Sequence, residues 1–258
     1  MPQKKAIFSG FLGYNYRLNY IILEIPSQFD TQDSTLIYKL RNTMRKIIAI
    51  VSSLFLVTII SAKAETIGIG VSGALHMLEA SGTETTRTSN QKNTGSHSED
   101  AAVPEVFIEM ISDNGGAFGV SYIPTRDLGS KSRSDTNAEG DTGTYTAKAE
   151  LDNVIKVYGD LPLGEIYGTT GYLHLGIQHI EVLTLESLNS GATYPNKNVF
   201  GYTVGAGVKG DIPYGNNLYY KGEVTYTDFE AYEANGSGNI VNADLDDTAV
   251  RFSVGYKF

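Results

Sequence analysis

The chain has 258 residues, of which 41% are hydrophobic and 19% charged, with no cysteine and a formal net charge of −9. The lack of cysteine excludes disulfides, thiolate zinc sites, iron–sulfur clusters and thiol catalysis. The acidic balance argues against a nucleic-acid partner, which would require a basic surface, and no apolar run is long enough for a multi-span helical membrane protein. The 28 glycines and 17 tyrosines favour many short strands joined by turns.

A candidate export signal begins inside the chain, at Met44. Met44-Arg45-Lys46 precedes a mainly apolar run of 14 residues, 47–60, which is followed by Ala62-Lys63-Ala64. This order is typical of a secretory signal peptide with a cleavage site marked by Ala62 and Ala64. A helix of this length reaches about 21 Å, short of the roughly 30 Å hydrocarbon core. We therefore predict a signal peptide at 44–64, with a single membrane anchor as the alternative.

The residues ahead of this signal, 1–43, show no sustained periodicity. We interpret them as a non-native upstream extension or as an extended n-region of the signal, and we exclude them from fold prediction. The remaining segment, 65–258, carries 12 of the 20 basic and 26 of the 29 acidic side chains. The exported protein is therefore predicted to be strongly acidic.

From Thr66 onward, apolar residues recur at every second position in eight segments, which is the period of a β-strand. Asp113-Asn114-Gly115-Gly116 is the clearest hairpin turn, because Asn and Gly tolerate the positive φ that tight turns require. The predicted strands are 67–77, 104–112, 117–123, 144–158, 165–180, 199–210, 217–227 and 248–258.

The connections between these strands alternate in length. Long polar stretches (79–103, 124–143, 181–198 and 228–247) alternate with short turns (113–116, 159–164 and 211–216). This rhythm is typical of a transmembrane barrel with extracellular loops on one side and tight periplasmic turns on the other. We predict that 65–258 forms an all-β, antiparallel up-and-down transmembrane β-barrel of eight strands, with both termini in the periplasm.

The two faces of the predicted strands differ in charge. With one parity chosen for each strand, no outward position is charged, as expected if lipid covers that face, since a Lys or Arg at mid-bilayer costs roughly 2–4 kcal/mol. The opposite parity, which includes Glu105, holds the charged side chains. We predict a lumen charge network or pore lining made of Glu109, Lys148, Glu150, Asp152, Lys156, Lys209, Lys221, Glu223, Arg251 and Lys257.

Aromatic residues gather near both ends of the predicted strands. Two aromatic belts are expected of a barrel in a bilayer, although the ordinary β-propensity of Tyr and Phe is an alternative explanation. The predicted belts are Tyr122, Tyr145, Phe200, Tyr202 and Tyr226 beside the loops, and Phe118, Tyr167, Tyr220, Tyr256 and Phe258 beside the turns.

The last strand has a terminal aromatic residue, Phe258, preceded at every second position by Tyr256, Val254, Phe252 and Val250. This pattern resembles the C-terminal strand of small bacterial outer-membrane β-barrels, such as the transmembrane domain of outer-membrane protein A. The resemblance implies that these five residues are an assembly signal read by the barrel-assembly machinery. It also implies periplasmic chaperones and outer-membrane lipid as partners, and the outer membrane as the location.

Three functions remain open from the sequence. An eight-stranded barrel has an interior that side chains can fill, and buried charges must pair, so we expect a non-enzymatic barrel with a structural or surface-interaction role through its loops. The alternative is a narrow channel for ions or small solutes, favoured by glycines that leave interior space for water or for strand curvature. These glycines are Gly68, Gly70, Gly119, Gly176, Gly205, Gly207 and Gly255.

The third function is a lipid-modifying enzyme. His76, His174, Ser72 and Ser121 share the inward parity, but their spacing does not indicate a catalytic triad. The six acidic residues of the 228–247 stretch are interpreted as a solvated surface loop that binds divalent cations weakly. We therefore expect no catalytic residues, no cofactor and no dedicated metal site, and the ligand of the surface loops stays open.

Overall fold

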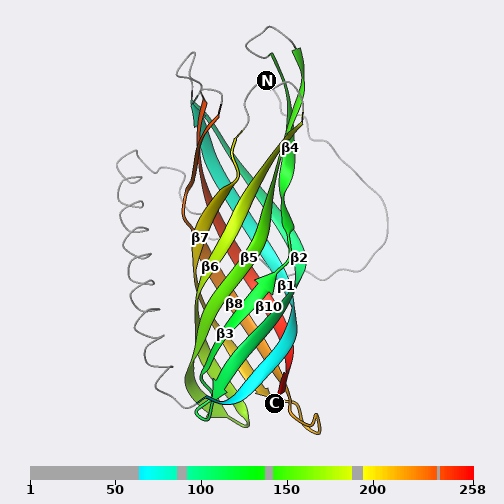
Figure 1. Cartoon of the computed structure of the whole chain (residues 1–258), viewed down its shortest axis with the longest axis vertical. Helices are drawn as coiled ribbons and strands as arrows, with labels where there is room; N and C mark the ends of the chain where they lie inside the picture. The colour runs from blue at the N-terminus through cyan, green and yellow to red at the C-terminus, as the bar shows by residue number, and fades with distance from the viewer. Residues whose placement is uncertain (1–63, 86–91, 137–141, 188–193, 237–238) are drawn as a thin grey trace, which may run out of the picture. The chain divides into compact units, whose positions relative to one another are not determined.

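The computed structural model describes residues 64–85, 92–136, 142–187, 194–236 and 239–258. The predicted signal peptide lies outside these ranges except for Ala64, the first residue of β1. The strands (Figure 1) are β1 (Ala64–Thr85), β2 (Lys92–Ser112), β3 (Ala117–Ile123), β4 (Arg126–Thr136), β5 (Thr142–Ile166), β6 (Thr169–Ser187), β7 (Lys197–Asp211), β8 (Leu218–Phe229), β9 (Tyr232–Gly236) and β10 (Asn239–Lys257). The described part of the chain contains no helix with the length and hydrophobicity of a membrane span.

Within the described residues, eight strands form a closed antiparallel ring. The order is β1-β2-β3-β5-β6-β7-β8-β10, and β10 pairs with β1 to close it. β4 continues the path of β3 along β5, and β9 pairs with β10 beyond the end of β8. The predicted eight-stranded, up-and-down barrel is therefore confirmed.

Side chains alternate across the wall of this ring. On β1, Ser72, Ala74 and His76 are buried inside, whereas Val71 and Leu75 are exposed on the outside. Exposed apolar side chains on every strand of the ring form an apolar outer band, which suits lipid rather than water.

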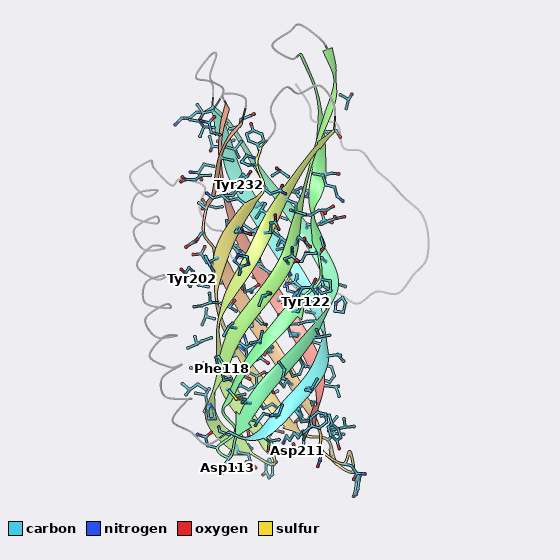
Figure 2. The ribbon with its side chains drawn as sticks, in the orientation of Figure 1. Asp113, Phe118, Tyr122, Tyr202, Asp211 and Tyr232 are labelled. Carbon is cyan, nitrogen blue, oxygen red and sulfur yellow. The ribbon has the colours of Figure 1, made fainter. Side chains whose placement is uncertain are left out.

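The aromatic residues mark the two edges of the apolar band. In Figure 2, Tyr122 and Tyr202 lie at a similar height, and Phe118 lies closer to the short turns that carry Asp113 and Asp211. This placement fits the two predicted belts. Tyr145 is the exception, because its side chain lies outside the described part of the structure.

The strands continue well beyond their predicted ends. β1 and β2 stay paired from Ile67↔Met110 up to Thr85↔Lys92, so the described residues of the stretch 79–103, which we predicted to be a loop, are strand extensions. In the other three long connections the described residues are likewise largely strand. The prediction was wrong because these extensions have water rather than lipid outside, so polar residues are frequent in them and hydrophobicity alternates little.

The turn between β5 and β6 also lies elsewhere than predicted. The chain runs through 159–164 as strand and reverses at Tyr167-Gly168, where φ is 52° and 77°. Positive φ at both central residues is typical of a two-residue hairpin turn. The proline and glycine that suggested a turn instead form a register shift between Pro162 and Gly164, since proline has no N–H for the ladder.

A second register shift in β5 changes which side chains face inward. It lies between Asp152 and Ile155, with Asn153 at φ 50°. Below it Val154 and Lys156 are buried, and above it Leu151 is buried. The inserted residue therefore turns Lys148 and Glu150, which we predicted to face the lumen, to the opposite face.

Candidate functional site

A layer of charged side chains fills the interior on the turn side of the barrel. Its members come from six strands, and all are buried. We call this set the charged layer; it consists of Glu105, Glu109, Lys156, Asp160, His174, Lys209, Lys221, Glu223 and Arg251.

Lys221 is at the centre of the lower half of this layer. Its Nζ lies 2.9 Å from Glu109 Oε2 and 2.8 Å from Asp160 Oδ2. The ammonium also lies 4.9 Å from the centroid of the Tyr158 ring. Tyr158 and Tyr219 donate hydrogen bonds of 2.8 and 2.9 Å to the Glu109 carboxylate. One lysine thus neutralises two carboxylates that have little access to water.

Arg251 has the same role in the upper half, where its guanidinium contacts both Glu105 and Glu223. Lys156 Nζ lies 3.1 Å from Glu105 Oε1. The Tyr172 hydroxyl donates a hydrogen bond of 2.9 Å to Glu223. Carboxylates and bases therefore alternate across the lumen, and Arg251, Glu105 and Glu223 each contact partners on two other strands.

The charged layer is balanced, and this bears on metal binding. Besides His174, its described members comprise four carboxylates and four bases. Asp160, His174 and Glu223 place possible ligand atoms within 4.8 Å of one another. Lys221 and Arg251 already neutralise these two carboxylates, however, and His174 Nδ1 lies 2.8 Å from Asp160. The arrangement therefore disfavours a cation.

A second buried ion pair lies on the loop side of the charged layer. Asp247 Oδ2 lies 2.7 Å from His76 Nδ1 and 3.3 Å from Arg126 Nη2. We predicted Asp247 and Asp228 to lie in a solvated acidic loop, but both are buried. The reason is that β8 extends to Phe229 and β10 begins at Asn239, so both aspartates lie on strands of the ring.

Still further toward the loop side, the interior becomes apolar. On β8, for example, Glu223, Thr225 and Thr227 face inward in turn and are followed by Phe229, which is fully buried. We call this cluster the apolar plug; it consists of Leu78, Val103, Ile123, Leu151, Val154, Ile180, Val182, Val199, Phe229, Tyr232, Ala234 and Leu245. This cluster was not predicted from the sequence, because most of its members lie beyond the predicted ends of the strands, namely Leu78, Val103, Val182, Phe229, Tyr232, Ala234 and Leu245.

The inward glycines make room for aromatic rings. A Cβ atom at Gly207 would lie 2.5 Å from Cζ of Tyr172, and one at Gly119 would lie 2.6 Å from Cζ of Tyr158. At these positions our expectation that glycine leaves space for water was wrong. The rings occupy the space and bring their hydroxyls to the carboxylates of the charged layer.

Replacing Gly207 with alanine should therefore destabilise the barrel. The added methyl group would also lie 2.7 Å from the backbone oxygen of Gly222, and overpacking of this kind costs about 1–3 kcal/mol. The midpoint of urea unfolding in lipid vesicles, followed by circular dichroism, measures the effect. Gly73→Ala is the matched control, since nothing lies within 4 Å of a Cβ there. Equal midpoints for the two variants would contradict the packing argument.

Four of the predicted lumen residues lie outside the charged layer. Lys148 Nζ lies 2.9 Å from Asp127 and 2.6 Å from Glu150 on the outer side of the β4–β5 extension. The hydrogen bonds that Lys148 donates to the Asp127 and Glu150 carboxylates raise its pKa to about 12.

The other two also lie near the surface. Asp152 accepts hydrogen bonds from Thr125 and Asn153 above the register shift in β5. Lys257 pairs with Asp211 beside the short turns. The other six predicted residues, Glu109, Lys156, Lys209, Lys221, Glu223 and Arg251, belong to the charged layer, which also contains Asp160 and His174.

The C-terminal strand places the predicted assembly residues on the outside of the barrel. Val250, Phe252 and Tyr256 are exposed, and Val254 is partly buried. Phe258 is exposed as well, and its backbone N–H donates a hydrogen bond of 2.9 Å to Ile67 O of the first strand. Reading of this strand by an assembly machinery stays a prediction.

No model of a known protein family matches the sequence, and no curated protein matches it. Among solved structures, the outer membrane protein OprG from Pseudomonas aeruginosa matches with a TM-score of 0.52 at 14% identity, over 76% of this chain and 97% of that chain. The chain has the fold of a small outer-membrane β-barrel. Neisserial surface protein A matches this barrel at 11% identity over 72% of this chain and 97% of that one, with a TM-score of 0.39. The outer membrane protease OmpT from Escherichia coli matches the barrel at 8% identity over 76% and 98%, with a TM-score of 0.43.

Of the inward histidines and serines considered above, Ser72, His76 and His174 have hydrogen-bond partners. Ser72 Oγ lies 2.8 Å from Ser253 Oγ, and His76 and His174 each contact an aspartate. No hydrogen bond between a serine and a histidine is found among the described residues.

Proposed function

We propose that this protein is a non-enzymatic barrel of the outer membrane with a closed lumen, and that it acts at the cell surface through its strand extensions. The observation that carries this proposal is the order of layers inside the barrel. The charged layer lies on the turn side and the apolar plug on the loop side. The two layers block the lumen by different physical means.

An ion entering from the turn side would meet charges that already neutralise one another. Separating Lys221 from Glu109 and Asp160 would leave buried charges without partners, which is costly. An ion that passed this layer would still have to shed water at the apolar plug, where Ile123, Leu151 and Phe229 are fully buried. Both layers therefore support a structural lumen over a narrow channel.

The strand extensions offer polar surface for an interaction. β10, β1 and β2 form a recess of about 770 Å³ beyond the apolar band, lined by Ser81, Thr83, Thr94, Asn242 and Asp244 among others. The rows Ser81↔Ser96 and Thr83↔Thr94 place hydroxyl groups side by side across the ladder. Such a surface suits a partner that forms many hydrogen bonds.

Single-channel conductance tests the closed lumen. We expect the purified protein to give no discrete current steps in a planar bilayer, after a heat-dependent gel shift has shown that it is folded. A general porin in the same bilayer is the positive control. Reproducible steps that change size when Arg251 is replaced with glutamine would show that the lumen conducts and would overturn the proposal.

A further inference from the structure

The turn-side mouth of the barrel contains a recess of about 790 Å³. Its wall is formed by the short turns and the strand ends beside them, including the turns that carry Asp113 and Asp211 in Figure 2. This volume lies within the range of about 300–1,000 Å³ found for small-molecule sites. Short turns face the periplasm in barrels of this fold, so the recess would open to that side.

Lys209 lines this recess, and its ammonium lacks a hydrogen-bond partner. The side chain is 8% exposed, and within the described residues Nζ donates no hydrogen bond. The nearest carboxylate oxygen, Asp160 Oδ2, lies 3.7 Å away, and the centroid of the Tyr172 ring lies 5.2 Å away. A buried ammonium without an acceptor is uncommon in folded proteins and calls for a bound group that supplies one.

Asp160 has two other basic groups at shorter distances. Its carboxylate already lies 2.8 Å from Lys221 Nζ and 2.8 Å from His174 Nδ1. Tyr219, which also lines the recess, donates its hydroxyl proton to Glu109. Asp160 and Tyr219 are therefore engaged in the charged layer, whereas Lys209 borders the recess without a hydrogen-bond partner among the described residues.

The rim of the recess carries the opposite charge. Asp113 and Glu165 line it and are exposed. No ion pair to either carboxylate occurs among the described residues. The third rim carboxylate, Asp211, is paired with Lys257. A ligand for this recess would thus meet one ammonium at the inner end and two carboxylates at the outer end.

We propose that this recess binds a small zwitterion, whose carboxylate accepts hydrogen bonds from Lys209 and whose ammonium group faces Asp113 and Glu165. A zwitterion leaves the balance of the charged layer unchanged, whereas a simple anion would add an unpaired charge next to Asp160 and the rim carboxylates. Inorganic phosphate is disfavoured for the same reason. This site does not depend on whether the lumen conducts.

The test compares probes matched in length and differing in charge. Linear ω-amino acids from glycine to 6-aminohexanoate are titrated into the purified full-length protein in detergent micelles. Butyrate, butylamine and phosphate are titrated in parallel. Binding is followed by the NMR chemical shifts of the turn amides near Gly115 and Gly168. We expect at least one ω-amino acid to bind about tenfold more tightly than either butyrate or butylamine. Equal affinities for the zwitterion and butyrate, or no binding of any ω-amino acid, would overturn the proposal.

Substitution of the two lysines that line the recess tests which of them binds the ligand carboxylate. Lys209→Met should weaken binding of the best zwitterion at least about tenfold, as expected for loss of a charged hydrogen-bond donor. Lys257→Met is the matched control, because that lysine lines the same recess but is already held by Asp211, and it should change the affinity less than twofold. An unchanged affinity in Lys209→Met would contradict the assignment.

The rim provides a test that does not depend on a buried substitution. Asp113→Asn combined with Glu165→Gln alters two exposed side chains, so the fold should be retained. We expect this double variant to bind the ω-amino acid no more tightly than it binds butyrate. A zwitterion advantage that survives in the double variant would show that the rim carboxylates do not bind the ammonium group.

Discussion

Replacing Lys221 with methionine should lower the free energy of unfolding by about 3–5 kcal/mol, the usual cost of removing one partner from a buried ion pair. The substitution keeps most of the side-chain volume, so the effect is mainly electrostatic. Glu109 would lose its only ammonium partner among the described residues, and Asp160 would keep only His174 and the more distant Lys209.

The measurement is urea unfolding in lipid vesicles, with Lys257→Met as the matched control. Lys257 also forms one ion pair with an aspartate, but its side chain is 30% exposed. Exposed pairs contribute at most about 1 kcal/mol. A loss in Lys221→Met as small as that in the control would mean that water reaches the charged layer. Adding Glu109→Gln to Lys221→Met should recover part of the loss, because it removes one of the unpaired carboxylates.

Replacing Phe229 with alanine should destabilise the barrel by a similar amount, about 3–5 kcal/mol, through loss of packing. The ring is fully buried in the apolar plug and covers Gly201, where a Cβ atom would lie 2.5 Å from it. Removal leaves a cavity on one wall of the plug. The backbone hydrogen bond from Glu230 N to Phe200 O, at the end of this strand, does not depend on the side chain.

Phe200→Ala is the control for this prediction. Phe200 lies on the neighbouring strand but faces outward, with 45% of its surface exposed. Lipid or detergent can fill the space of an outward ring, so the loss should be smaller. If both variants unfold at the same urea concentration, the apolar plug contributes no more to stability than the outer surface does.

The membrane half of the barrel was predicted well from the sequence, because outward side chains that contact lipid must be apolar and therefore alternate strictly with the inward ones. Lys156, Lys209, Lys221 and Glu223 were all assigned to the interior from parity alone, and all four are buried. The same reasoning failed for Lys148, since one inserted residue near Asn153 exchanges the two faces of β5. A register shift leaves no mark in a hydrophobic pattern, and its position becomes apparent only when the partner strand is known.

Asp160 was missed for a different reason. It lies in the segment 159–164, which contains two glycines and a proline and whose composition therefore predicts a turn. The burial of Asp247 could not be predicted either, because its surroundings are acidic and polar. In both cases the residue is held by bases from distant strands, Lys221 for Asp160 and Arg126 for Asp247. Such long-range pairing is not encoded in any local pattern.

The register shift at Asn153 also separates two parts of one strand that face different solvents. Below it, the outward side chains of β5 face lipid, and the inward side chains contact the charged layer. Above it, the same strand has water on its outer face. Lys148 and Glu150 lie on that face and pair with each other rather than with the charged layer. Deleting one residue here would move Leu151 outward and carry Lys148 and Glu150 inward. The shift thus lets the membrane half of β5 keep Lys156 and Asp160 inside, while the half paired with β4 presents Lys148 and Glu150 on its outer face.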